Sequence, residues 1–285
     1  MYDIQALELK AVQIRRDILE LVTRGQGPAH PAPSLSCADI LTALYFGVLR
    51  VDPANPQWTD RDRFILSKGH AAPALYAALA EKGYFDRSWF PTLRRCGSRL
   101  QGHPDMTKTP GVDMTTGSLG HGLSAGVGMA VGLKLRRQKA NVYVLLGDGE
   151  IQEGIVWEAA MTAGRFKLDN LIAMVDYNHI QSSGFMEDIM PMEPLRTKWE
   201  SFGFHVLEMN GHNMREILDT LERAKVIKGA PVMIIAHTTK GQGVSYMEND
   251  PSWHTGIPTP ELYRQAMAEL DAAQERILTL GGSAR

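Results

Sequence analysis

The stretch Val142–Gly154, VYVLLGDGEIQEG, joins a hydrophobic strand to a glycine-rich turn that carries acidic residues. A run of apolar residues leads directly into Gly147-Asp148-Gly149, and Glu150 and Glu153 follow. A carboxylate at the end of a buried strand is costly unless a cation meets it. Glycine lets another group approach the backbone closely. The stretch therefore predicts a strand whose end holds a metal ion and a phosphate group.

Around this stretch, apolar strands alternate with helical segments through the second half of the chain. Such alternation favours an α/β fold in which a mostly parallel sheet forms three layers with helices on both faces. No linker, repeat or low-complexity segment divides residues 1–285, so we expect a single domain. The predicted strands are 63–67, 142–146, 170–176, 204–209 and 231–237. The predicted helices are 3–24, 37–46, 76–83, 152–165, 193–202, 213–227 and 259–277.

Three other segments show different patterns. Residues 25–34 and the long segment 96–120 are rich in glycine and proline and are predicted as loops. Residues 122–130 place small side chains at helical spacing, which permits tight packing.

A second oxygen-bearing side chain follows the next predicted strand. Asn178 ends the run LIAMVDYN, about one strand–helix–strand unit after Asp148. Neighbouring parallel strands deliver their carboxyl ends to one edge of a sheet, where ligands bind. Carboxylate and amide oxygens, completed by a backbone carbonyl and diphosphate oxygens, suit Mg²⁺ or Ca²⁺. Taken singly, a turn aspartate and a capping asparagine would explain these residues, whereas the pair at this spacing favours a metal site.

Composition excludes several classes of function. Of the 285 residues, 44% are hydrophobic and 22% are charged, and the formal net charge is -2 at pH 7. This balance gives no reason to expect nucleic acid as a partner. Cys37 and Cys96 match neither a zinc spacing nor a disulfide framework, which suits a reducing compartment. Because no signal core or membrane-spanning run is present, we expect a soluble cytoplasmic protein with no membrane partner.

Residues 147–181 are similar to the thiamin diphosphate signature, which begins with Gly-Asp-Gly and closes on an asparagine. Five further segments narrow the resemblance to the transketolase family, and together they extend over about residues 10 to 265. These segments are HPAPSLSCADIL (30–41), ILSKGHA (65–71), GHPD (102–105), VDMTTGSLGHGLSAGVGMA (112–130) and GQGVSYMENDPSWHTG (241–256). The resemblance implies a thiamin diphosphate-binding fold, in its diphosphate-binding module.

A full transketolase continues with a pyrimidine-binding domain and a third domain, whereas this sequence ends at Arg285. The resemblance therefore implies the N-terminal, diphosphate-binding subunit of a split transketolase of the bacterial type. It implies a second chain with the missing domains, and an assembly with two copies of each chain. The glutamate that polarises the aminopyrimidine, and most arginines that bind the sugar phosphate, would belong to that second chain.

The implied activity is transfer of a two-carbon ketol unit from a ketose phosphate donor to an aldose acceptor, in carbohydrate metabolism of the pentose phosphate kind. The implied cofactors are thiamin diphosphate and Mg²⁺ or Ca²⁺. By resemblance, Asp148 and Asn178 ligate the metal through side-chain oxygens, and Ile180 does so through its backbone carbonyl. Glu153 aligns with an acid in a carboxylate network between two active sites, although an exposed glutamate favoured by a helix dipole is the alternative. The implied cofactor contacts are His70, Gly117, Ser118, Leu119, Gly149, Glu153, Asn178 and His254.

Nine histidines are present, and four of them lie in segments that match the family. By resemblance these four bind substrate hydroxyls, contact the diphosphate and transfer protons at the reacting carbonyl, a task for which histidine titrates in a suitable range. The four catalytic candidates are His30, His70, His103 and His254. His70 could instead cap the helix that follows it. His179, His205, His212 and His237 are expected to be ordinary surface or core residues.

Two positions depart from the family pattern. His121 stands where many relatives have glutamine, which changes the hydrogen-bond donors near the cofactor. Pro28 and Pro31 flank His30 and stiffen a loop that is usually richer in glycine.

Three other functions remain open from the sequence. A 2-oxoacid dehydrogenase-type subunit would share the cofactor signature, but it would not be expected to keep the histidine segments. A specialised transferase, similar to deoxyxylulose-phosphate synthase, would use another acceptor. A non-catalytic subunit would bind the cofactor and support a partner.

Overall fold

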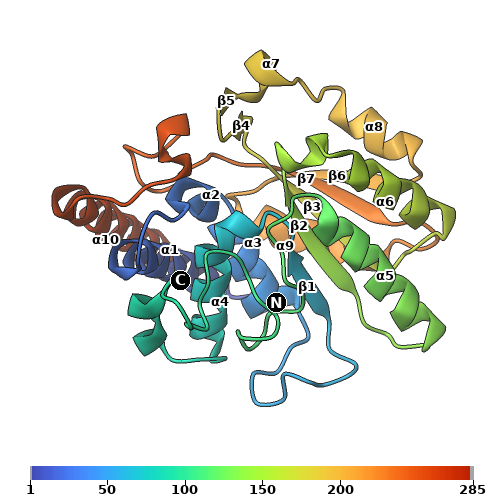
Figure 1. The fold of residues 1–285 in the computed structure, drawn as a ribbon, viewed down its shortest axis with the longest axis horizontal. Coiled ribbons are helices and arrows are strands. Elements are labelled where there is room, and N and C mark those ends of the chain that lie inside the picture. Colours follow the sequence, from blue (N-terminus) through green and yellow to red (C-terminus); the bar gives the residue numbers. More distant parts are fainter. Residues whose placement is uncertain (1, 283–285) are drawn as a thin grey trace.

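The centre of the molecule is a five-stranded sheet, seen in a computed structural model that describes residues 2–282 (Figure 1). The strands lie in the order β1-β2-β3-β7-β6, and every neighbouring pair is parallel. Their bounds are β1 Arg63–Leu66, β2 Val142–Gly147, β3 Leu171–Tyr177, β6 His205–Asn210 and β7 Val232–His237. All five predicted strands, and the predicted parallel sheet, are confirmed.

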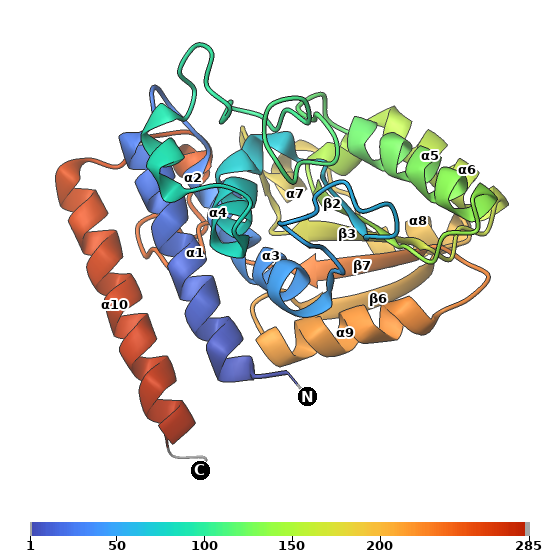
Figure 2. The ribbon, with the colours of Figure 1, turned by 90° about the horizontal axis from the view of Figure 1, so that it is seen from below.

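The side chains of β2 alternate between two hydrophobic cores, one on each face of the sheet. Val142, Val144 and Leu146 belong to one core, and Tyr143 and Leu145 belong to the other. The first core is covered by α5 (His121–Leu135), α6 (Gly154–Arg165) and α8 (Leu195–Ser201). The second is covered by α1 (Ile4–Arg24), α2 (Pro31–Ser36), α3 (Ala38–Ala43), α4 (Ala72–Lys82), α9 (Met214–Val226) and α10 (Pro260–Gly282). Figure 2 shows α5 and α6 on one side of the sheet and α9 on the other, which confirms the predicted three layers.

Local signals account for where several helices begin and end. The Asp3 side chain accepts a hydrogen bond from the Ala6 N–H, and Asn213 caps α9 in the same way. Gly83 ends α4 with a φ of 96°, a conformation that favours glycine. Helices α1 and α10 run side by side in opposite directions, and an Arg16–Asp271 ion pair joins them.

The prediction of a loop over residues 25–34 is wrong in part, because α2 begins at Pro31. Pro31 and Pro33 stand in the first turn of this helix, where a missing backbone N–H leaves no hydrogen bond unmade. The predicted helix 37–46 is α3 followed by a π-helical turn over Leu44–Val48.

Several short elements were not expected from the sequence. They are the hairpin of β4 (Ile180–Gln181) and β5 (Gly184–Phe185), the short helix α7 (Met186–Ile189), and 3-10 turns at Gly69–Ala71, Arg87–Thr92, Glu150–Gln152 and Pro251–His254. In the part of the chain that the structure describes, no helix combines the length and apolar character needed to cross a membrane.

Candidate functional site

The candidate site lies at the carboxyl edge of the sheet. Strands β2 and β3 are neighbours, as predicted, with Gly147 opposite Asp176 in the register. Asp148 and Asn178 therefore leave the sheet side by side. They line a cavity of about 390 Å³, together with Ile180, Gly149 and all four candidate histidines.

Asp148 is a buried carboxylate held by backbone groups. It is 3% exposed, and it accepts hydrogen bonds from the N–H groups of Gly149 at 2.8 Å, Asn178 at 2.9 Å and His179 at 2.6 Å. No cation forms an ion pair with it among residues 2–282. Burial, followed by the nearby Asp176 carboxylate, raises the pKa of Asp148 to about 6. A positive ion beside this carboxylate would relieve that cost.

The two other predicted metal ligands lie next to each other. The Asn178 Oδ1 atom accepts a hydrogen bond from the Ile180 N–H at 3.2 Å. The Ile180 carbonyl accepts one from the Lys240 ammonium at 3.0 Å and keeps a second lone pair. A carboxylate, an amide oxygen and a backbone carbonyl around one cavity form the donor set that fits a hard divalent cation.

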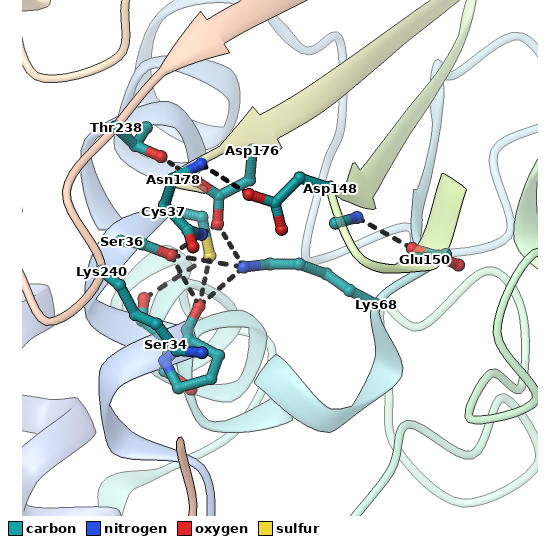
Figure 3. A network of polar contacts seen from close by, with 12 residues as sticks. Ser34, Ser36, Cys37, Lys68, Asp148, Glu150, Asp176, Asn178, Thr238 and Lys240 are labelled. Atoms are coloured by element: carbon teal, nitrogen blue, oxygen red, sulfur yellow. Dashed lines mark hydrogen bonds and ion pairs between the residues drawn. The ribbon is translucent and has the colours of Figure 1, made fainter. Parts of the chain in front are cut away.

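A buried ion pair beneath the cavity was not predicted from the sequence. The Lys68 ammonium pairs with the Asp176 carboxylate, and both side chains are at most 2% exposed. Lys68 also donates to the Pro33 carbonyl at 2.7 Å, and Asp176 accepts from the hydroxyls of Ser36 and Thr238 (Figure 3). Although burial opposes both charges, the pair raises the pKa of Lys68 and lowers that of Asp176. This network joins α2 and β3 to the segments that directly follow β1 and β7.

Lys240 is a further buried cation that sequence reasoning missed. Its ammonium is within hydrogen-bond distance of the carbonyls of Ile180, at 3.0 Å, and Gln181, at 3.2 Å, and of His254 Nδ1 at 2.9 Å. Burial lowers the pKa of Lys240 to about 8. It immediately precedes the quoted segment at 241–256, which is the signal that could have identified it.

The four candidate histidines come together from four separate segments. Ring centroids lie 5.2 Å apart for His30 and His70, 5.4 Å for His30 and His254, 5.2 Å for His70 and His254, and 6.4 Å for His30 and His103. A β-bridge between Ala29 and Gly256 holds two of these segments together.

Burial disfavours the charged form of these imidazoles. Burial lowers the pKa of His30 to about 4 and that of His254 to about 3, with neighbouring positive and histidine groups adding to the effect. Burial also lowers the pKa of His70 and of His103. His30 Nδ1 is buried without a hydrogen-bond partner among residues 2–282. This buried atom therefore has an unused hydrogen-bonding capacity within these residues.

The remaining histidines lie outside this group. His179, His205 and His237 are exposed, and His212 bonds to Asp39 at 2.8 Å. None of these four lines the 390 Å³ cavity. His121 is exposed at the start of α5.

The segment Gly117–Leu119 closes one side of the cavity. Gly117 has a φ of 145°, and a Cβ there would lie 3.1 Å from the His103 ring, so this position requires glycine. Gly117 and Leu119 line the cavity, whereas Ser118 is exposed beside it. Glu150 anchors the end of this segment by accepting a hydrogen bond from the Gly120 N–H at 2.8 Å.

Glu153 lies at the rim of the cavity. Its side chain is exposed and makes no capping hydrogen bond to α6, although it precedes that helix.

The cavity at the carboxyl edge of this parallel sheet is lined by oxygen donors, a buried cation and a histidine cluster, and this combination indicates a class of cofactor-binding protein. Such a protein binds a phosphate-bearing cofactor at the carboxyl ends of its strands. Residues 9–262 match the family described as "Transketolase, thiamine diphosphate binding domain". The chain therefore belongs to the transketolase family and has its thiamin diphosphate-binding fold.

Relatives of similar length are subunits of transketolases. The chain is 45% identical over 274 residues to one subunit of the apulose-4-phosphate transketolase of Phocaeicola vulgatus, covering 96% of this chain and 97% of the relative. It is 48% identical over 265 residues to the 6-deoxy-6-sulfo-D-fructose transketolase subunit SqwG of a Clostridium species, covering 93% and 96%. Human transketolase is 40% identical over 259 residues, which cover 90% of this chain and 41% of the human protein.

Solved transketolases share the fold over nearly the whole chain. The Campylobacter jejuni enzyme aligns with a TM-score of 0.85 at 31% identity, and the Leishmania mexicana enzyme with 0.82 at 27%. These alignments cover 97% and 100% of this chain but 46% and 48% of the solved chains. The chain thus spans about half the length of these enzymes.

Proposed function

We propose that this chain is the cofactor-binding subunit of a split transketolase, which transfers a two-carbon ketol unit from a ketose phosphate to an aldose. The proposal rests on one observation: oxygen donors and a cluster of histidines line the same cavity. The oxygen donors lie at the ends of β2 and β3, and the four candidate histidines line the same cavity. The first group suits a metal diphosphate and the second suits a polyhydroxylated substrate.

The metal and the diphosphate would be held at the sheet edge. Asp148, Asn178 and the Ile180 carbonyl are the proposed ligands of Mg²⁺ or Ca²⁺, with diphosphate oxygens completing the coordination. Gly149 is a further proposed contact of the diphosphate, and Lys240 adds positive charge. The other proposed cofactor contacts are His70, Gly117, Ser118, Leu119 and His254.

The four histidines would form hydrogen bonds to the substrate and take part in proton transfer. Thiamin diphosphate, when bound, supplies the nucleophilic carbon that allows a carbon–carbon bond beside a carbonyl to be cleaved and formed. That chemistry requires a proton to be taken from an alcohol and later returned. Burial lowers the pKa of His30, His70, His103 and His254, which favours the neutral imidazole as a hydrogen-bond partner of substrate hydroxyls.

A second chain is part of the proposal, because relatives that align over nearly their whole length are named as transketolase subunits. That chain would carry the pyrimidine-binding and C-terminal domains, and the assembly would contain two copies of each. Glu153 would join a carboxylate network between the two active sites. A cytoplasmic location and sugar phosphate substrates of the pentose phosphate kind complete the proposal. Both cysteines are free, which suits a reducing compartment.

A donor comparison tests the proposed reaction. The chain is mixed with a subunit carrying the pyrimidine-binding domain, thiamin diphosphate and Mg²⁺, and is offered either a ketose phosphate with an aldose acceptor or a 2-oxoacid. We expect ketol transfer and no decarboxylation of the 2-oxoacid. Decarboxylation without ketol transfer would favour a 2-oxoacid dehydrogenase-type subunit, and cofactor binding without turnover of either donor would favour a non-catalytic subunit.

The histidine roles can be tested in the same mixture. We expect His103→Ala and His254→Ala each to lower turnover while cofactor affinity stays within a few-fold. Loss of an acid–base group costs about 10²–10⁴ in rate, and loss of a hydrogen bond to a hydroxyl costs less. His205→Ala is the control, because His205 is exposed at the opposite end of the sheet. Wild-type turnover in either variant would remove that histidine from the mechanism.

A further inference from the structure

A second cavity adjoins the candidate site on the far side of His103. It has a volume of about 350 Å³ and is lined by residues of the segment 94–116, including Arg94, Gly102, His103 and Asp105. His103 lines both this cavity and the one that holds the oxygen donors. The second cavity therefore lies directly beside the histidine cluster.

Arg94 is an exposed residue that lines this cavity from an unusual backbone conformation. Its φ of 65° lies in the left-handed region, which is uncommon for a residue with a side chain, and its N–H donates to the Leu100 carbonyl at 2.8 Å. Its guanidinium lies against Gly102, where a Cβ would stand 2.5 Å from Nη1. The glycine thus makes room for the guanidinium.

The charge of Arg94 is not neutralised within the chain. In the described residues its side chain takes part in no ion pair and no hydrogen bond, although its charge contributes to the lowered pKa values of His30 and His103. Asp105 also lines the cavity, but its carboxylate interacts with residues of its own loop. It accepts from the Thr107 N–H at 2.9 Å and the Thr107 hydroxyl at 2.7 Å, and it lies 3.5 Å from Lys108.

A guanidinium presents a planar fork of donors that matches tetrahedral oxyanions. We propose that Arg94 binds the terminal phosphate or sulfonate of the sugar substrate in this second cavity. This assignment rests on the proposed ketol transfer and adds a specificity residue supplied by this chain to whatever the second chain contributes.

Acceptor selectivity tests the assignment. Mixed subunits are assayed with D-glyceraldehyde, D-glyceraldehyde 3-phosphate, and the same aldehyde with a sulfonate in place of the phosphate. For Arg94→Gln we expect the ratio of kcat/KM for either anionic acceptor to that for D-glyceraldehyde to fall by about 10- to 100-fold. A fall for only one anion identifies which of the two the cavity receives. Arg95→Gln is the matched control, because Arg95 is exposed, adjacent and outside the cavity, and it should keep the wild-type ratio. Unchanged ratios in Arg94→Gln, or equal falls in both variants, would overturn the assignment.

A binding measurement separates this assignment from the proposed function. The ¹⁵N-labelled chain alone is titrated with glycerol 3-phosphate while the amide resonances of Gly102 and His103 are followed. We expect saturable shifts in the wild type and in Arg95→Gln, and at least about tenfold weaker binding in Arg94→Gln. Equal binding in all three proteins would refute the anion site even if ketol transfer is observed. Absence of ketol transfer together with Arg94-dependent binding would instead refute only the proposed reaction.

Discussion

Asp148 combines two roles that have opposite effects on the free chain. Its carboxylate is buried and forms no ion pair among residues 2–282, which is unfavourable, yet three backbone N–H groups donate to it. We expect Asp148→Ala to lower the affinity for thiamin diphosphate in the presence of Mg²⁺ by more than about 100-fold. We expect it to lower the free energy of unfolding by about 1–3 kcal/mol, because N–H groups lose their acceptor.

Isothermal titration with thiamin diphosphate and Mg²⁺, together with urea unfolding, measures both effects. Asp219→Ala is the control, because Asp219 is exposed on α9. Wild-type cofactor affinity in Asp148→Ala would remove Asp148 from the metal site.

His30 makes stability depend on pH. Its pKa is about 4 in the folded chain, against 6.5 for an unperturbed histidine, so the unfolded chain binds a proton first as the pH falls. The contribution of neutral His30 is therefore complete above about pH 6.5 and is lost as the pH falls toward 4. Relative to His30→Asn, we expect the wild type to lose about 1–2 kcal/mol of unfolding free energy between pH 7 and pH 4.5, after allowance for partial exposure.

Denaturant unfolding of both proteins at the two pH values measures this difference. Carboxylates with raised pKa values, such as Asp17 and Asp148, are present in both proteins and cancel in the comparison. An equal change with pH in the two proteins would mean that His30 is not held neutral by burial.

At the scale of elements, small residues on α5 set its distance from the sheet. A Cβ at Gly126 would lie 2.6 Å from Val144 Cγ2, whereas a Cβ at Gly128 would meet nothing within 4 Å. We expect Gly126→Ala to destabilise the chain by about 1–3 kcal/mol, because Val144 is buried and stiff at χ1. Gly128→Ala should stabilise it by about 0.5–1 kcal/mol through helix propensity. Urea unfolding of the pair is the measurement, and equal effects would show that α5 does not pack on β2 as described.

The strands could be predicted from sequence because their signals are local. Apolar runs such as residues 142–146 identify buried strands. The prediction that β2 and β3 are neighbours, with Asp148 and Asn178 following their ends, is confirmed. Helix α2 was missed because prolines usually mark loops, although they fit a first turn.

The parts of the site that could not be predicted depend on distant partners. Lys68 and Asp176 are 108 residues apart in the sequence, and Lys240 meets the Ile180 carbonyl across 60 residues. Each looks like an ordinary charged residue until the fold places its partner beside it. The family resemblance located the four histidines, but their short ring distances and low pKa values follow from burial in the folded chain.

For the molecule as a whole, we propose that the candidate site forms one side of an active centre. Its cavity holds groups suited to a metal diphosphate and to substrate hydroxyls, and by the proposal the group that activates the aminopyrimidine comes from another chain. We therefore propose that this chain binds the cofactor and completes an active site only with a second subunit.

Titration of the second subunit into this chain tests that claim most directly. Ketol transfer from a ketose phosphate is measured for the purified chain with thiamin diphosphate and Mg²⁺, and then with rising amounts of a subunit that carries the pyrimidine-binding domain. Mass in solution is determined at each ratio. We expect no transfer by the chain alone, and activity that levels off at equal amounts of the two chains in an assembly with two copies of each. Substantial ketol transfer by the purified chain alone would contradict it.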